Sequence, residues 1–231
     1  MRVGTLVGTG LLLAFIGCPP AFAGREAYLI GGVSLSNLGG DADLFGQAIA
    51  DQLEVDIGGV WTSQKKVRTG FDMGLGVSYT SLGALGAAME LRYATRGAKY
   101  QFNENSGSTL SLTGTWKLNY VEIPVLVRVT PQVSGSIRPV LLFGPVLGVK
   151  ASSSFEVEAA GSSASVPVGE TMKSTYFAGL AGAGIIVGFS RQTSLQLQAR
   201  YQQGFTNLID ATEPVFKSTG FSIMAGLSWA I

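Results

Sequence analysis

The clearest pattern in the chain is an alternation of large apolar residues with small or polar residues at every second position. In residues 71–79, Phe, Met, Leu, Val and Tyr alternate with Asp, Gly, Gly and Ser. A period of two places successive side chains on opposite faces of a β-strand, so each such strand has one apolar face and one polar or glycine-rich face. The pattern predicts eight strands, at residues 27–36, 68–80, 85–96, 119–129, 137–150, 175–189, 193–204 and 219–231.

The connections between these strands alternate in length. Those after the first, third, fifth and seventh strands are long, and those after the second, fourth and sixth are short. Bacterial outer-membrane barrels have short turns on the periplasmic side and long loops outside, and strands of about ten residues cross the bilayer at a tilt. We therefore predict an all-β fold, an eight-stranded antiparallel up-and-down transmembrane β-barrel, for residues 24–231. The first long connection also predicts a short helix at residues 41–53, with Asp41 as its N-cap.

A soluble barrel in the periplasm is the alternative fold. It would need polar outer faces, whereas the apolar rows of residues 71–79 and 221–231 would then meet water. The interior of an eight-stranded barrel is just wide enough to be filled by side chains. We therefore expect the aliphatic rows to face lipid, and the glycines and charged residues to face the barrel axis.

The first 23 residues are typical of a secretory signal peptide. Arg2 precedes an apolar stretch at residues 3–16, and Ala21, Phe22 and Ala23 form a small-x-small cleavage site. Lipid attachment at Cys18 is the alternative. With cleavage after Ala23, the mature chain would contain no cysteine and depend on no disulfide.

Composition narrows the class of protein. Apolar residues make up 46% of the chain and charged residues 13%, with 32 glycines among 231 residues. No apolar run after the N-terminus approaches the ~20 residues that a spanning helix needs. Removing Arg2 with the signal peptide leaves 15 of the 16 basic residues against 15 acidic residues, a balance that gives no electrostatic reason to expect nucleic-acid binding.

The chain contains no histidine. Histidine is the side chain that most often serves as a general base, and the remaining residues show no spacing typical of another catalytic pair. The acidic residues of the first long connection match no calcium-loop spacing. We therefore expect no enzyme activity, no catalytic residues, no bound metal and no cofactor.

Six charged residues fall on the glycine-rich faces of the predicted strands. Charges in such a position need partners, so we expect them to form ion pairs inside the barrel. A proton or ion path is the alternative role. The expected interior charges are Asp72, Glu90, Arg92, Glu122, Arg128 and Arg200.

Basic residues gather at the ends of the strands that lead into the long connections. If those connections face outward, the cations would form a collar beside the outer leaflet, where they suit lipopolysaccharide phosphates. The candidate contacts are Lys65, Lys66, Arg68, Arg96, Lys99, Lys117, Lys150, Lys173 and Lys217.

Aromatic residues near the predicted strand ends suggest a belt of rings at the membrane interface. A carbohydrate-stacking site is the alternative for the same side chains. The residues concerned are Tyr28, Trp61, Tyr79, Tyr93, Tyr100, Trp116, Tyr176 and Trp229.

Four pieces of the chain resemble the outer-membrane β-barrel domain family that includes PorT-like, porin-family proteins of Bacteroidetes-type bacteria. The resemblance implies a location in the outer membrane of a Gram-negative cell, and neither an enzyme nor one agreed molecular role. PorT-like proteins also suggest a part in a secretion machine. The matching pieces are residues 89–93 with 96–99, 120–124, 138–145 and 199–207.

The C-terminal residues 224–231 resemble the signal that the barrel-insertion machinery reads, with Gly226, Trp229 and Ile231 at its key positions. The expected partners are therefore outer-membrane lipid, lipopolysaccharide and that machinery, together with an unidentified surface or secretion protein. The expected function is a structural or surface-interaction role, with four extracellular loops on a closed barrel. Narrow-pore transport of small solutes or ions, and a part in secretion, are the alternatives.

Overall fold

A computed structural model of the chain describes residues 24–80, 84–105, 111–131, 133, 135–159, 162–167, 172–190, 192–209 and 214–231. The predicted signal peptide lies outside the described residues. The elements in chain order are β1 (Gly24–Gly40), α2 (Ala42–Ile57), β2 (Trp61–Lys66), β3 (Arg68–Thr80), β4 (Leu85–Glu104), β5 (Ser111–Val129), β6 (Ile137–Ala159), β7 (Ser162–Pro167), β8 (Thr175–Gly188), β9 (Thr193–Gly204) and β10 (Phe216–Ala230).

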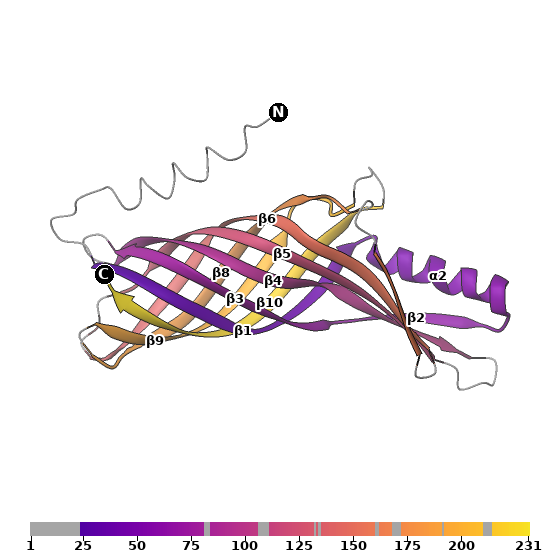
Figure 1. Ribbon diagram of the computed structural model, residues 1–231, viewed down its shortest axis with the longest axis horizontal. Coiled ribbons are helices and arrows are strands. Elements are labelled where there is room, and N and C mark those ends of the chain that lie inside the picture. The colour runs from indigo at the N-terminus through magenta and orange to yellow at the C-terminus, as the bar shows by residue number, and fades with distance from the viewer. Residues whose placement is uncertain are drawn as a thin grey trace, which may run out of the picture.

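Eight of these strands close into a ring (Figure 1). All neighbours are antiparallel, in the order β1, β3, β4, β5, β6, β8, β9 and β10. The first and last strands pair from Glu26 opposite Ala230 to Gly40 opposite Phe216, which closes the ring. The predicted eight-stranded barrel is confirmed, and the bounds predicted for β3 and β9 coincide with the observed ones.

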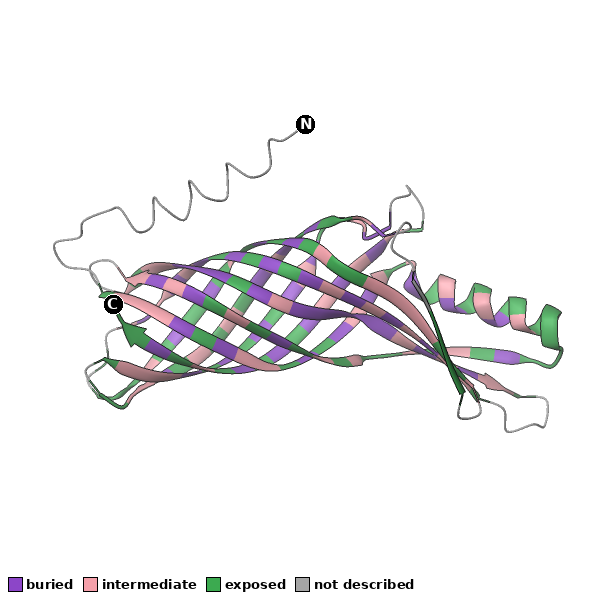
Figure 2. Cartoon of the chain, in the orientation of Figure 1, coloured by how far each residue is buried: buried purple, intermediate pink, exposed green. Residues whose placement is uncertain are grey.

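Burial alternates along each strand as the sequence pattern predicts (Figure 2). On β3, the side chains of Phe71, Met73 and Leu75 are exposed on the outer surface, whereas Asp72 between them is buried. The apolar rows therefore face outward, as a barrel in lipid requires, and the polar rows face the axis.

Three strands of the ring are longer than predicted and continue beyond the barrel at one end. Residues 97–114 and 151–174 were expected to be loops, but β4 extends to Glu104, β5 begins at Ser111 and β6 extends to Ala159. On β4 and β5 the loop expectation was wrong because the inward side chains of these strands are covered by other parts of the protein. Tyr100, Phe102 and Trp116 are buried beneath α2 and its neighbours, although the segments look polar in sequence.

These extensions form what we call the head, which is α2, β2, β7 and residues 98–104, 111–118 and 152–159. β2 pairs with β4, and β7 pairs with β6. The head lies at the opposite end of the barrel from the C-terminus (Figure 1). Because the short connections lie at the C-terminal end, the head belongs to the side of the long loops.

A β-bulge separates β2 from β3. Lys66 lies opposite Lys99, and Asp72 lies opposite Ala94, so six steps along one strand match five along its partner. An extra residue of this kind reverses which side chains face inward. Odd-numbered side chains such as Lys65 therefore face inward on β2, whereas on β3 the even-numbered positions from Asp72 to Ser78 do so.

The predicted helix exists but extends further, to Ile57. Asp41 precedes it without a side-chain cap hydrogen bond, and its Oδ2 instead accepts a hydrogen bond of 2.8 Å from Val215 N. This bond ties the start of α2 to the segment before β10. No helix among the described residues is long and apolar enough to cross a membrane.

Candidate functional site

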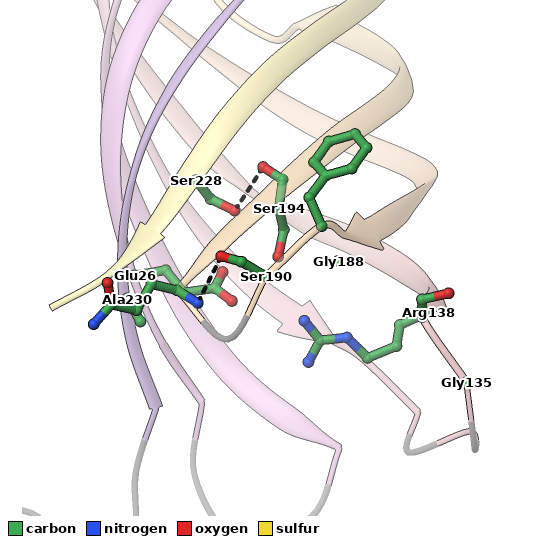
Figure 3. A pocket seen from close by; sticks show the side chains of 11 residues that line it. Glu26, Gly135, Arg138, Gly188, Ser190, Ser194, Ser228 and Ala230 are labelled. Carbon is green, nitrogen blue, oxygen red and sulfur yellow. Dashed lines mark hydrogen bonds between the residues drawn. The ribbon is translucent and has the colours of Figure 1, made fainter.

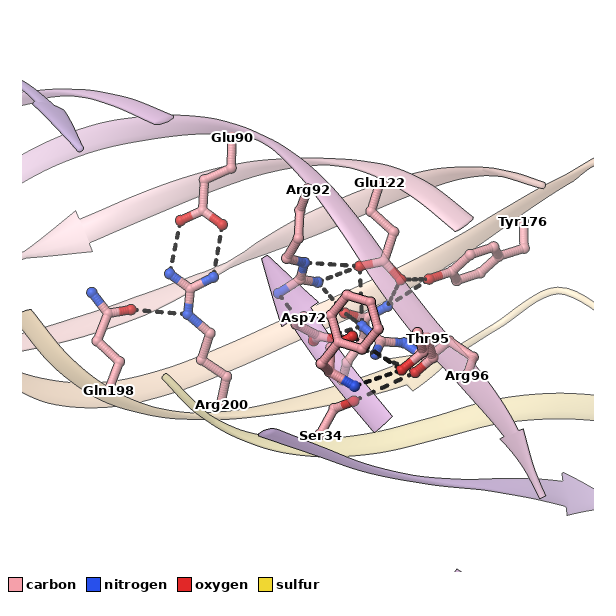
Figure 4. Close-up of polar contacts among 12 residues, drawn as sticks. Ser34, Asp72, Glu90, Arg92, Thr95, Arg96, Glu122, Tyr176, Gln198 and Arg200 are labelled. Carbon is pink, nitrogen blue, oxygen red and sulfur yellow. Dashed lines mark hydrogen bonds and ion pairs between the residues drawn. The ribbon is translucent and has the colours of Figure 1, made fainter. Parts of the chain in front are cut away.

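The middle of the barrel holds a cluster of paired charges (Figure 4). Arg92 and Arg96 come from β4, and both contact the Glu122 carboxylate of β5. Arg96 Nη1 also lies 2.7 Å from Asp72 Oδ1 on β3. All four side chains are almost fully buried, so the cluster contains two positive and two negative charges with no net charge.

Two uncharged side chains complete this cluster. The Tyr176 hydroxyl of β8 bonds to Glu122 Oε1. Gln202 of β9 donates 2.7 Å to the Tyr176 hydroxyl and accepts 2.6 Å from Arg92 Nη2. The cluster thus joins strands from opposite sides of the ring, and it leaves the carboxylate of Glu122 surrounded by donors, as a buried charge requires.

A second cluster lies nearer the C-terminal end. Arg200 of β9 makes a two-pronged contact with Glu90 of β4, and both nitrogen–oxygen distances are 2.7 Å (Figure 4). The Tyr28 hydroxyl donates 2.8 Å to the same carboxylate, and Gln198 accepts 2.9 Å from Arg200 Nε. This pair is also neutral.

The third ion pair lies close to the C-terminal mouth of the barrel. Arg128 Nη1 lies 2.9 Å from Glu26 Oε2 and also contacts the Ser78 hydroxyl. Glu26 also lines a polar pocket of about 540 Å³ at this mouth, with Arg138 on the opposite wall (Figure 3). Ser194 and Ser228 form part of the wall and share a hydrogen bond. The pocket stops short of the buried Tyr28 and Glu90.

The structure places all six expected interior charges inside the barrel, each at most 3% exposed. Glu90 with Arg200 and Glu122 with Arg92 are pairs between residues of that set. The other two members pair with residues outside the set. Asp72 lies closer to Arg96 than to Arg92, and Arg128 pairs with Glu26. Neither Arg96 nor Glu26 was expected in the interior.

The expectation that Arg96 contacts lipopolysaccharide is wrong. Its side chain is 2% exposed and points to the axis, where it bonds to Asp72 and Glu122. The sequence did contain the signal, because Arg96 continues the even-numbered row of Glu90 and Arg92. Because the predicted strand ends at residue 96, the prediction placed this arginine at the rim.

The expectation of an aromatic belt agrees with the position of only three of the eight residues. Tyr79, Tyr93 and Trp229 are partly or fully exposed on the strands. The other five are buried, so the belt expectation is wrong for them, and they fill the interior and the head instead. These buried residues are Tyr28, Trp61, Tyr100, Trp116 and Tyr176.

Several of the remaining cations bond to the protein itself. Lys65 faces inward, donates 3.0 Å to Leu38 O and forms an ion pair of 2.9 Å with Asp43. Lys150 Nζ donates 2.5 Å to Met172 O. These two side chains therefore have their partners within the protein.

The other cations lie at the barrel's outer rim. Lys66 contacts Gln101, Arg68 contacts the carbonyl of Arg96, and Lys117 contacts Glu156. Three further cations are half-buried: Lys99 on β4, Lys173 just before β8, and Lys217 on β10. Lys66, Arg68, Lys99 and Lys117 share one part of the surface, whereas Lys173 and Lys217 lie elsewhere on the rim.

In the head, α2 packs on a cluster of aromatic rings. The Phe45 ring lies 5.5 Å from Phe216, 5.7 Å from Trp116 and 6.3 Å from Tyr100. Gly46 allows this close approach, because a Cβ there would lie 2.9 Å from the Tyr100 ring. The helix therefore covers the mouth of the barrel with apolar side chains.

The far part of the head exposes apolar side chains. Val55 is 80% exposed, Ile57 is 60% exposed, and Val60 is exposed as well. Leu44, in the first turn of α2, is also exposed. Acidic residues such as Asp51 lie on the same helix. No group of three or more His, Cys, Asp or Glu side chains suited to a metal ion occurs within the described ranges.

The residues of the expected insertion signal lie at the C-terminal end of β10. Gly226 approaches β1 closely, since a Cβ there would lie 2.3 Å from Leu29 O. Trp229 and Ile231 are exposed on the outside. Recognition of these residues by the insertion machinery stays a prediction.

A search of curated proteins finds no match. Among solved structures, the chain is similar to Neisserial surface protein A (11% identity, TM-score 0.42, covering 89% of this chain and 97% of that one). It is also similar to Ail, the attachment invasion locus protein of Yersinia pestis (14% identity, TM-score 0.39, covering 89% of this chain and 98% of that one). A third similar structure is OprG from Pseudomonas aeruginosa (11% identity, TM-score 0.39, covering 89% of this chain and 95% of that one).

One family matches by sequence. The model of the outer membrane protein beta-barrel domain matches residues 44–210, well over half of the chain. The match spans the head and most strands of the ring, including the charged interior. The chain therefore belongs to the outer membrane protein beta-barrel domain family, and it is an outer-membrane protein of the cell.

Proposed function

We propose that this protein is a closed barrel with a structural or surface-interaction role that is carried by its head. The observation that carries the proposal is the neutral charge cluster around Glu122, which occupies the middle of the barrel. Each of its charges contacts an opposite charge at short range. A path for solutes would need these pairs to separate, which is costly for buried ions.

The packing on both sides of this cluster supports a closed barrel. Arg92 and Arg200 are among the largest fully buried side chains of the protein. Eight strands leave an interior that side chains can fill, unlike the wide lumen of larger porins. At the outer end, Phe45 and the rings around it cover the mouth.

The head supports a surface-interaction role. Val55, Ile57 and Val60 are exposed large apolar residues at the end farthest from the barrel. Water-exposed apolar groups beside acidic ones are typical of a protein-binding surface. We infer that the head binds another protein at the cell surface, and a secretion component would be one such partner.

Single-channel recording on the refolded protein in planar bilayers tests the closed barrel. We expect no steady conductance from the wild type. A variant in which residues 42–60 are replaced by a short Gly-Ser linker serves as the comparison, because it removes the outer cover. Steady conductance of the wild-type protein would overturn the proposal in favour of narrow-pore transport.

Site-specific photo-crosslinking in intact cells tests the surface role. A photoreactive residue at position 55 or 57 should give protein adducts, and the same residue at position 75, on the outward face, should give none. An adduct at position 57 should disappear when Val55 and Val60 are changed to Ser. Equal labelling at position 75, or adducts unaffected by these changes, would rule out a binding surface on the head.

A further inference from the structure

Four cations meet on the outward surface where the barrel joins the head. Lys66 and Lys99 lie directly opposite each other on β2 and β4. Their neighbours Lys65 and Tyr100 face inward, so alternation turns Lys66 and Lys99 outward. The two ammonium groups therefore share one face of the sheet.

Lys117 and Arg68 extend this group on either side. Lys117 is paired with Gly97, so it lies diagonally across from Lys99 on the same face. The Arg68 guanidinium crosses the same glycine, because a Cβ at Gly97 would lie 3.3 Å from Arg68 Nη1. The four side chains thus cover a continuous surface of β2, β3, β4 and β5, which we call the cationic patch.

The charges of the patch are incompletely neutralised by the protein. Like charges directly opposite each other on antiparallel strands destabilise the pair. Lys66 contacts the neutral amide of Gln101. The carboxylate that contacts the patch among the described residues is Glu156, which pairs with Lys117 and also attracts Arg68. One negative charge against four positive ones leaves a surplus that an external anion would satisfy.

The height of the patch relative to the lipid bilayer indicates which kind of anion would bind to it. On the same outward face, Phe71 and Tyr93 stack with their ring centres 5.8 Å apart. Below them lie the exposed aliphatic side chains of the lipid-facing rows. Aromatic rings of this kind sit at the level of lipid headgroups. The patch lies immediately beyond them, toward the head, which is where headgroup phosphates of the outer leaflet lie.

We propose that Lys66, Arg68, Lys99 and Lys117 form a binding site for the phosphorylated headgroup of an outer-leaflet lipid. A guanidinium and several ammonium groups are the donors that suit phosphate oxygens. The site goes beyond the proposed role of the head and does not depend on it. It also narrows the collar of nine rim cations to four residues. Arg96, Lys65 and Lys150 bond to groups of the protein itself, and Lys173 and Lys217 lie elsewhere on the rim.

The test compares two charge-matched double variants of the full chain, refolded in a detergent without phosphate. K66Q/K99Q removes two cations from the patch, and K173Q/K217Q removes two from elsewhere on the rim. Native mass spectrometry then measures binding of diphosphorylated lipid A, dephosphorylated lipid A and inorganic phosphate. We expect K66Q/K99Q to bind diphosphorylated lipid A at least about tenfold more weakly than the wild type, and K173Q/K217Q to bind it as the wild type does.

A second measurement uses the repulsion between the two lysines. Without a phosphorylated lipid, the single variant K99Q should unfold at a higher temperature than the wild type, because the like-charged pair is removed. With diphosphorylated lipid A present, the order should reverse. Equal losses of affinity in both double variants, or equal binding of dephosphorylated lipid A, would overturn the proposal. Inorganic phosphate that competes as well as lipid A at equal phosphate concentration would overturn the lipid assignment.

Discussion

Arg200 and Glu90 face each other across the interior of the barrel and form two parallel contacts of 2.7 Å, although they are 110 residues apart in the sequence. They come from β9 and β4, which are not neighbours in the ring. The pair therefore links strands that no backbone hydrogen bond joins. Its geometry is of the kind that gives an arginine–carboxylate contact both strength and direction.

Breaking this pair from one side should destabilise the barrel strongly. Glu90→Leu leaves the guanidinium of Arg200 buried without its partner, which costs about 3–5 kcal/mol. The double variant Glu90→Leu/Arg200→Met should lose clearly less than the sum of the two single variants. Urea unfolding in lipid vesicles measures both values.

The matched control for this prediction is an ion pair whose carboxylate is exposed. Asp43→Asn removes the partner of Lys65, and the Asp43 side chain is 71% exposed. Such surface pairs contribute about 0–1 kcal/mol. A Glu90→Leu loss as small as that of Asp43→Asn would show that water reaches the Glu90 site.

Filling the space above a specific glycine should disturb the central cluster. Gly148 lies directly opposite Tyr176, and a Cβ at position 148 would lie 2.0 Å from the tyrosine ring. Gly148→Ala should push the ring away from Glu122 and cost about 1–3 kcal/mol. Gly31→Ala is the control, because its nearest heavy atom would be 3.7 Å away. The midpoint of the heat-dependent shift in gel mobility should fall for the first variant alone, and equal midpoints would contradict the packing.

A charge on the outward face should be penalised by lipid. Leu75 is 54% exposed on the outer surface in the middle of β3. Leu75→Arg would place a guanidinium in hydrocarbon, at a cost of about 2–4 kcal/mol near the bilayer midplane. Leu44→Arg, on the exposed side of α2, should change stability by no more than about 0.5 kcal/mol. Unfolding in lipid vesicles measures the loss of stability in each variant. Similar losses in the two variants would argue against lipid at Leu75.

Loss of the Phe45 ring should loosen the head without opening the ring of strands. Phe45→Ala removes three aromatic contacts, at a cost of at most about 3 kcal/mol because the side chain is only partly buried. Limited proteolysis should then cut α2 faster, whereas the shift in gel mobility should persist. Leu44→Ala, at an exposed position of the same helix, should leave the cutting rate unchanged. Loss of the mobility shift in Phe45→Ala would mean that the head is required for the barrel itself.

Part of the site was predictable because alternation is a local property. Asp72, Glu90 and Arg200 each lie in a row of small or polar residues, and the backbone of a strand sends every such row to one side. Gln198 and Gln202 share the row of Arg200, so their place in the interior followed from the same pattern. The contacts among them did not, because partners such as Arg200 and Glu90 meet only after the ring has closed.

The head was largely missed for a related reason. Tyr100 and Trp116 lie in segments rich in polar residues, so the sequence predicts both for the interface belt and Tyr100 for a loop. They are buried because α2 packs over them, and its first residue, Ala42, lies 58 residues before Tyr100 in the sequence. The bulge between Lys66 and Asp72 was also invisible, because one extra residue on a strand is defined only against its partner strand.

The sequence by itself determined that this chain forms eight two-faced strands with apolar rows suited to lipid, since strand periodicity depends only on neighbouring residues. Tertiary structure decided which buried charges neutralise one another, which side of β2 carries Lys66, and what covers the mouth of the barrel. Those features depend on strand register and on contacts between distant segments, and neither is encoded in any single stretch of the chain.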